Sequence, residues 1–162
     1  MEFRLAKFEE LPLVQALYHS VIGSKFCTWD EDYPGFKEIN TDYGNLSLFV
    51  LTEGDALLGA VSAVPENELE ELDCWQHREN TAELARVVVA PSVQGKGLSR
   101  NLVTEAETLL RKRGTEAVHL LAAVQNLPAN RCYASCGYKR YAPVEMYDNL
   151  YYPCEKKLGG ST

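Results

Sequence analysis

Hydrophobic and polar positions change period several times along this chain, and each change marks an element. Weak alternation over Phe3–Phe8 predicts a first strand. The apolar positions that follow keep helical spacing, at Leu11, Val14, Tyr18, Val21 and Ile22. Pro12 suits the first turn of such a helix. Residues 23–45 are aromatic, acidic and interrupted by Pro34-Gly35 and Gly44, which predicts a short helix or two in irregular chain.

The middle of the chain has the pattern of strands. Leu46–Thr52 and Ala56–Val64 are apolar runs joined by Glu53-Gly54-Asp55, which is typical of a β-hairpin. Residues 65–80 form an acidic connection with room for a short helix. The β-branched run Thr81–Val89 then predicts the next strand.

Helices and strands alternate in the C-terminal half. Helical spacing runs through Leu98, Leu102, Val103, Ala106, Leu109 and Leu110. Arg111-Lys112-Arg113-Gly114 ends this helix, with cations at the negative end of the dipole and glycine as the stop. Ala117–Val124 predicts a strand covered on both faces. A helix from Pro128 to Gly137 and strands at Tyr138–Ala142 and Leu150–Leu158 follow. The order β-α-(α)-β-β-β-α-β-α-β-β indicates a mixed α/β fold whose N-terminal half is mostly antiparallel.

One loop has a sequence that is typical of a binding site. Gln94-Gly95-Lys96-Gly97-Leu98-Ser99 comes after a strand that stops at Pro91, and it opens directly into a helix. A helix start offers unpaired N–H groups and the positive end of the helix dipole, which together attract phosphate. The loop therefore predicts a seat for a phosphate-bearing cofactor, with an ordinary strand-to-helix turn as the plainer interpretation. Dinucleotide-binding, P-loop and hydrolase-elbow patterns are absent from it.

Composition narrows the class of protein. The 162 residues, 46% of them hydrophobic, suit a single domain over residues 1–162. No apolar run approaches the roughly 18 residues of a membrane span, and the N-terminus lacks a basic start to an apolar run. The five cysteines are odd in number and scattered, which favours reduced thiols and a cytoplasmic location. Cys132 and Cys136 lie one helical turn apart, but no nearby histidine completes a ligand set, so we expect no metal.

Charge is distributed unevenly around a net value of −7. Residues 27–80 hold thirteen acidic and two basic residues, whereas residues 81–162 hold seven acidic and eleven basic ones. The positive half would attract an anionic cofactor and the negative half a cationic second substrate. Both halves can equally be solvated faces. We expect no nucleic-acid partner, because basic residues do not interleave with aromatic ones.

Two motifs together resemble those of the GNAT superfamily of acyl-CoA-dependent N-acyltransferases. The first is Gln or Arg, two residues, Gly, one residue, then Gly or Ala, and it stands here at residues 94–99 with Ser99 in the last place. The second is complete as Asn126, Ala129, Tyr133 and Gly137-Tyr138. Serine is the next smallest residue, so the backbone can still approach a pyrophosphate. The resemblance is thinnest over residues 23–45 and 65–80.

The resemblance implies a fold and a cofactor. The fold would be a central mixed sheet of about seven strands flanked by about four helices, with acetyl-CoA as co-substrate. The strand before the loop would bulge and part from its neighbour, and pantetheine would lie in the gap. The residues implied in cofactor binding are Val87, Val88, Val89, Gln94, Gly95, Lys96, Gly97, Leu98, Ser99, Arg100, Asn126, Ala129 and Tyr133.

Two residues are implied in the chemistry. Tyr133 would be the general acid that protonates the departing thiolate, or else a core aromatic. Glu83 would be the base, expected on one face of its strand with residues 85, 87 and 89, or else a carboxylate that pairs with Arg86 or is solvated. Asn126 would cap its helix or bind pantetheine. Trp29, Tyr33 and Tyr43 would line the acceptor cleft or cover the sheet.

The functional hypothesis is N-acetyl transfer from acetyl-CoA to a primary amine by direct attack in a ternary complex. The alternative is a non-catalytic acyl-CoA-binding sensor or regulatory module on the same fold. The expected partner is a small-molecule or peptide amine, with no membrane and no nucleic acid, and a homodimer is left open.

Overall fold

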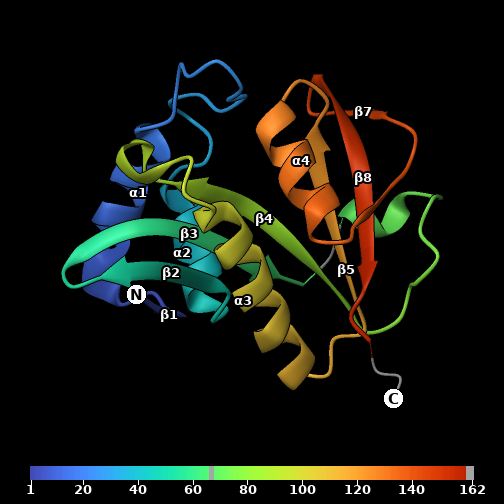
Figure 1. The fold of residues 1–162 in the computed structure, drawn as a ribbon, viewed down its shortest axis with the longest axis horizontal. Helices are drawn as coiled ribbons and strands as arrows, with labels where there is room; N and C mark the ends of the chain where they lie inside the picture. Colours follow the sequence, from blue (N-terminus) through green and yellow to red (C-terminus); the bar gives the residue numbers. More distant parts are fainter. Residues whose placement is uncertain (66–67, 160–162) are drawn as a thin grey trace.

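A single eight-stranded sheet runs through the protein in the order β1-β2-β3-β4-β5-β8-β6, with β7 also paired to β8 (Figure 1). The computed structural model describes residues 1–65 and 68–159. The strands are β1 Glu2–Leu5, β2 Leu48–Glu53, β3 Ala56–Val64, β4 Thr81–Val89, β5 Ala117–Ala123, β6 Lys139–Arg140, β7 Val144–Met146 and β8 Asn149–Lys157. The α-helices are α1 Leu11–His19, α2 Phe36–Gly44, α3 Leu98–Lys112 and α4 Leu127–Ser135. Short 3₁₀ turns cover Phe8–Glu10, Glu68–Glu71 and Pro91–Val93.

Strand directions divide the sheet into two antiparallel parts. Strands β1 to β4 are antiparallel neighbours, as the sequence predicted for this half. Strand β8 pairs antiparallel with β5, β6 and β7. The two parts meet in the parallel pair β4–β5. A parallel neighbour needs a crossover connection, and α3 supplies it.

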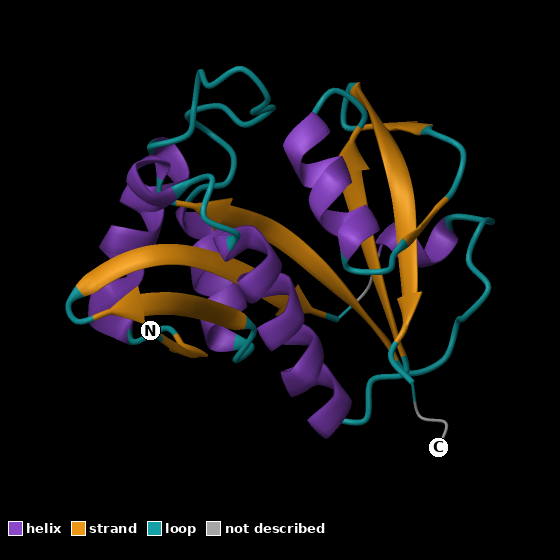
Figure 2. Ribbon diagram, viewed as in Figure 1, coloured by secondary structure: helices purple, strands orange, loops and turns teal. Residues whose placement is uncertain are grey.

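Helices cover both faces, so that α3 and α4 lie in front of the sheet and α1 and α2 behind it in the view of Figure 2. Strand β2 shows how the alternating pattern serves both layers. Phe49 and Leu51 belong to the core cluster under α3 and α4, whereas Leu48 and Val50 belong to the cluster under α1 and α2. Because successive side chains of a strand point to opposite faces, one continuous apolar run fills both cores.

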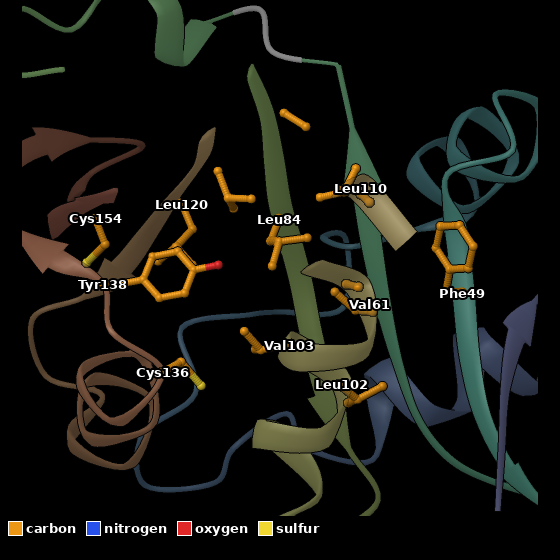
Figure 3. Close-up of a cluster of buried hydrophobic side chains, with 14 of the residues drawn as sticks. Phe49, Val61, Leu84, Leu102, Val103, Leu110, Leu120, Cys136, Tyr138 and Cys154 are labelled. Carbon is orange, nitrogen blue, oxygen red and sulfur yellow. The ribbon is translucent and has the colours of Figure 1, made fainter. Parts of the chain in front are cut away.

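The larger cluster joins the two parts of the sheet. Figure 3 shows Val61 and Leu84 from β3 and β4 in one group with Leu120 and Cys154 from β5 and β8. Val103 of α3 packs in the same group.

A buried ion pair crosses the same junction from α3 to β8. Lys156 Nζ lies 2.8 Å from Glu107 Oε1, and Glu107 is only 2% exposed. Arg111 Nε also donates to the Leu158 carbonyl at 2.9 Å. Helix α3 therefore helps to hold the two parts of the sheet together at the junction, where β4 and β5 share only a short ladder.

The predicted elements agree closely with the observed ones from residue 46 onward. Strand β4 has the predicted bounds, and α3 ends before Gly114 as expected. The fold class is confirmed, with eight strands in place of about seven, because β7 was not predicted.

Differences concentrate in the less regular segments. Strand β1 ends at Leu5, since Phe8–Glu10 forms a 3₁₀ turn that leads into α1. One α-helix, α2, forms within residues 23–45, and residues 66 and 67 of the acidic connection lie outside the described residues. In the part of the chain that the structure describes, no helix is long and apolar enough to cross a membrane.

Candidate functional site

Strands β4 and β5 separate after a short stretch of pairing. Their ladder joins Thr81 to Ala117, Ala82 to Val118 and Glu83 to His119, and it stops there although β4 continues to Val89. Figure 1 shows the two strands together at one end and diverging toward the other. The second half of β4 therefore has β3 as its neighbour on one edge and no strand ladder to β5 on the other.

A β-bulge lies in β4 where the strands diverge. On β3, Ala60 and Ser62 are two residues apart, but their partners Val88 and Ala85 are three residues apart, so β4 carries one extra residue. Arg86, at this point, has φ of 53°. A non-glycine residue in this left-handed region costs on the order of 1–3 kcal/mol, so the surrounding structure must compensate.

The bulge changes which side chains share a face. Ala82 and Leu84 belong to the core cluster under α3, and so does Val89, while Val87 packs against that cluster. Val88 lies in the cluster under α1 and α2. The expectation that residues 83, 85, 87 and 89 share one face is therefore wrong, because the extra residue shifts the alternation between Ala85 and Val87.

Backbone groups beyond the bulge face the diverging edge. The Ala90 N–H donates to the Leu58 carbonyl at 2.8 Å, toward β3. Alternate residues of an antiparallel strand direct their polar groups to the same edge, so Val88 also faces β3, while Val87 and Val89 face β5. The Val89 carbonyl accepts from Gln94 Nε2 at 3.0 Å, which anchors the following loop to this edge.

The loop at 94–99 ends at the start of α3. Gly95 and Gly97 have φ of 81° and 79°, a conformation that side-chain-bearing residues rarely adopt. Gly97 is the N-cap residue of α3, and the first intrahelical bond runs from Asn101 N–H to the Gly97 carbonyl at 3.2 Å. The amides of residues 98–100 thus have no intrahelical acceptor. Together with exposed Lys96 and Arg100, these amides bring hydrogen-bond donors and positive charge to the start of the helix, an arrangement that suits an anion.

Helix α4 places Tyr133 on the β5 side of the divergence. The ring packs against the larger core cluster and meets Tyr138 edge-on, with centroids 5.9 Å apart. Burial raises the pKa of the Tyr133 phenol above its ordinary value, with a smaller contribution from Cys132. The phenol is therefore protonated at neutral pH.

Asn126 caps α4, which is one of the two roles expected for it. Its Oδ1 accepts from the Ala129 amide at 3.2 Å. Asn130, which sequence reasoning missed, donates from Nδ2 to the carbonyls of Ala123 and Asn126 at 3.1 and 2.9 Å. Asn130 therefore joins α4 to the end of β5, while Asn126 caps the start of the helix.

Arg86 makes an ion pair that the sequence did not reveal. Its guanidinium donates to both carboxylate oxygens of Asp42 in α2, with distances of 2.8 to 3.0 Å, and to the Tyr33 hydroxyl at 3.1 Å. Ser62 of β3 donates to Asp42 Oδ2 at 2.6 Å. The guanidinium of Arg86, the residue that the sequence suggested as one partner for Glu83, binds Asp42 and Tyr33. Glu83 itself is half-buried beside His119 in the ladder.

The aromatic residues of the middle segment separate into two groups. Trp29 and Tyr43 pack against the smaller core cluster, and Trp29 meets Tyr18 edge-on at 5.4 Å. Tyr33 is 45% exposed next to the bulge. The Tyr33 hydroxyl accepts from Arg86, which lies in β4.

Some of the acidic residues of the same segment are used locally. Asp30 Oδ1 accepts from the amides of Asp32 and Tyr33, Glu38 accepts from the Gly35 amide, and Asp42 binds Arg86. Residues 30–32 remain exposed beside Tyr33.

A second polar cluster lies on the opposite face of β5 and β8 from α4. His119 Nε2 lies 2.7 Å from Glu155 Oε2, and the Trp75 ring stacks on His119 with centroids 3.8 Å apart. Glu155 also accepts from the Tyr141 hydroxyl and from the amides of residues 76 and 77. No motif marks this cluster, because its members are far apart in the sequence.

Hydrogen bonding controls the ionisation of Glu155. Burial by itself disfavours the carboxylate, but the hydrogen bonds from Tyr141 and His119 and from the two amides outweigh it, so the pKa of Glu155 is lowered. The carboxylate thereby anchors the connection that covers this face of the sheet. Among residues 1–65 and 68–159, no three His, Cys, Asp or Glu side chains are grouped so as to hold a metal ion.

The sequence pattern of a known family covers this site. The model of the acetyltransferase (GNAT) family matches residues 14–138, which include β4, the loop and α4 up to Tyr138. The chain belongs to this family.

Individual relatives agree with that assignment. Over 73 residues the chain is 42% identical to a mycothiol acetyltransferase of Thermomonospora curvata, a match that covers 45% of this chain. The chain spans about a quarter (25%) of the length of that curated relative. Among solved structures, a putative acetyltransferase from Salmonella typhimurium with its cofactor acetyl-CoA has a TM-score of 0.77 at 19% identity, covering 100% of this chain and 96% of that one.

A second solved structure has the same fold with a related ligand. The PaiA N-acetyltransferase from Thermoplasma acidophilum in complex with coenzyme A has a TM-score of 0.71 at 22% identity, over 96% of this chain and 98% of that one. At these identities the likeness establishes the fold, and the acetyltransferase (GNAT) family assignment comes from the sequence pattern.

The Glu155 anchor predicts a pH-dependent contribution to stability. Glu155→Gln should lower the free energy of unfolding at pH 7 by about 1–3 kcal/mol, because buried donors lose a charged acceptor. The native pKa lies below the unfolded value of about 4.3, so this stabilisation is complete above that pH and is lost as the pH falls through the native pKa. Urea denaturation at a series of pH values measures the difference between variant and wild type.

Glu145→Gln, at an exposed position of β7, is the matched control and should change stability little at any pH. If the difference in unfolding free energy between Glu155→Gln and wild type stays constant down to pH 3, well below the unfolded pKa, the proposed stabilisation by the Glu155 carboxylate is contradicted.

Proposed function

We propose that the protein transfers an acetyl group from acetyl-CoA to a primary amine by direct attack in a ternary complex. The observation that carries the proposal is the bulged strand β4, which parts from β5 after Glu83 and continues into the anion-binding start of α3. An extended pantetheine arm with amide groups fits an edge of this kind, and a pyrophosphate fits the helix terminus.

The cofactor would lie along β4 from the loop toward the bulge. The backbone groups of Val87 and Val89 face the gap and would pair with the pantetheine amides, and the amides of residues 94–99 would hold the pyrophosphate. Lys96 and Arg100 would add positive charge at the rim. Ser99 is half-buried, and its small side chain leaves the helix start accessible. An N–H of β4 beyond the bulge would polarise the thioester carbonyl as charge develops on its oxygen.

The chemistry then needs three proton transfers, because a cationic amine gives up one proton before it attacks and a second, to water, as the amide forms, while the departing thiolate gains one. The amine nitrogen attacks the thioester carbon, the oxyanion collapses, and the C–S bond breaks. We assign Tyr133 as the acid that gives its phenolic proton to the departing thiolate, since it is half-buried, neutral and on the β5 side of the gap. We assign Glu83 as the base that takes the excess amine proton, directly or through water, since it occupies the last paired position before the strands part.

The acceptor would be a cationic primary amine, such as a polyamine, an amino sugar or a protein amino group. The exposed acidic run at residues 30–32 supports this class, because it directly precedes Tyr33, which contacts the bulge. Acetylation of neutral amino acids without acetylation of polyamines or amino sugars would show that the acceptor class is wrong. The alternative of a non-catalytic sensor predicts coenzyme A binding with no thiol release on any amine.

Replacing the proposed acid separates binding from turnover. Tyr133→Phe should lower kcat by roughly 10²-fold or more, because general acid help is lost, while coenzyme A still binds. Thiol release gives the rate, and thermal stabilisation gives binding, with about 2.7 kcal/mol expected at 100 times the dissociation constant. Tyr151→Phe removes the hydroxyl of a half-buried tyrosine on β8 and is the control. Equal rates for Tyr133→Phe and wild type would exclude the acid role.

Replacing the proposed base should lower the rate by an amount that depends on pH. Glu83→Gln should lower kcat/KM most at pH 6–7, by roughly 10²-fold, and less as the pH approaches the acceptor amine's own pKa, where the amine no longer needs a protein base. A loss of the same size at every pH would indicate a structural role for Glu83.

A further inference from the structure

The bulge in β4 is strained, and the side chain of its extra residue reaches helix α2 and the segment that contains Tyr33. Arg86 sits at the extra residue with φ of 53°, and its own guanidinium meets Asp42, which is 2% exposed. Asp42 belongs to α2, behind the sheet, and Ser62 of the adjacent strand β3 completes its hydrogen bonding. The residue that adopts the unfavourable backbone conformation therefore also has a side chain held by several hydrogen bonds.

The geometry of the pair suits a clamp. Nε and Nη2 of Arg86 both reach the carboxylate, at 3.0 and 2.8 Å to the Oδ2 atom, and Nη2 also lies 3.0 Å from Oδ1. Such a forked contact fixes the plane of the guanidinium and therefore the direction in which the side chain leaves the strand. The side chain of Arg86 is 13% exposed and that of Asp42 is 3% exposed, so little water competes for these bonds.

The remaining nitrogen of the same group reaches a different segment. Nη1 of Arg86 donates to the hydroxyl of Tyr33 at 3.1 Å. Tyr33 follows the acidic run 30–32, and the turn at Asp30 is closed by hydrogen bonds between Asp30 and Tyr33. The cofactor-side strand and the segment that we place beside the acceptor thus share one guanidinium.

We propose that Arg86 is a positioning residue, which fixes the β4 bulge for cofactor binding through Asp42 and attaches the acceptor-side segment at residues 30–33 to the same strand through Tyr33. The inference rests on the proposed function and adds to it. Without the bulge, Val87 and Val89 would return to the regular alternation and turn their polar groups toward β3. The clamp therefore determines which backbone groups face the gap.

The two arms of the clamp can be tested separately. Arg86→Lys keeps the charge but not the fork, so it should weaken coenzyme A binding about tenfold or more, as expected for the loss of one or two pantetheine hydrogen bonds. Tyr33→Phe removes only the second arm, so the dissociation constant for coenzyme A should stay unchanged while KM for the acceptor rises. Isothermal titration with coenzyme A and steady-state kinetics measure the two quantities.

The chain offers a matched control for the first arm. Arg4 and Glu10 also form a forked pair, with bonds of 2.9 and 2.8 Å, between β1 and the turn before α1. Arg4→Lys should leave both coenzyme A affinity and acceptor KM unchanged. Coenzyme A affinity equal to wild type in Arg86→Lys would overturn the clamp. Absence of coenzyme A binding in the wild type would instead overturn the proposed function.

A double variant distinguishes positioning from simple stabilisation. Arg86→Met with Asp42→Leu replaces the ion pair by apolar side chains of similar volume, a change that often leaves stability unaffected. We expect a folded protein with an unchanged unfolding midpoint and weakened coenzyme A binding. This variant also decides the question if Arg86→Lys does not fold. A folded double variant that binds coenzyme A as wild type does would overturn the proposal.

Discussion

The rest of the structure depends on an interrupted ladder between β4 and β5. Three residue pairs join the two parts of the sheet, and the strands then diverge. A backbone edge of this kind keeps polar groups that need partners, and leaving them without any would be costly in a core. The protein compensates around the junction, with the core cluster under α3 and α4, the Glu107–Lys156 pair and the Arg111 contact to β8. The sheet can therefore stay open at one end without separating.

The bulge determines which backbone polar groups of β4 lie on the edge that diverges from β5. One extra residue in β4 turns Val87 and Val89 toward the gap and keeps Val88 and Ala90 bonded toward β3. The same strand leads into the start of α3, so extended backbone groups and a helix terminus lie in line. Backbone groups of this kind depend little on which side chains the strand carries. Acidic and basic side chains lie around these backbone groups, in Arg86, Asp42 and Glu83.

The sequence predicted those parts that depend on local patterns. Two glycines that need positive φ, the helix stop at Gly114 and the apolar alternation of β2 to β5 are readable from neighbouring residues, so the fold and the loop followed. The Arg86–Asp42 pair joins residues 44 positions apart, and His119–Glu155 joins residues 36 apart, so no local pattern marks either. The bulge also escaped prediction in detail. An extra residue in a β-branched run reads as regular strand, and the side-chain alternation was wrong beyond Ala85 for that reason.

Hydrogen–deuterium exchange with and without coenzyme A tests the central claim most directly. If pantetheine occupies the edge of β4 beyond the bulge, the amides of Val87 and Val89 and those of residues 98–100 should become protected on binding, while the edge strand β1 should stay unchanged. Binding of coenzyme A with no added protection at Val87, Val89 and the start of α3 would contradict the account.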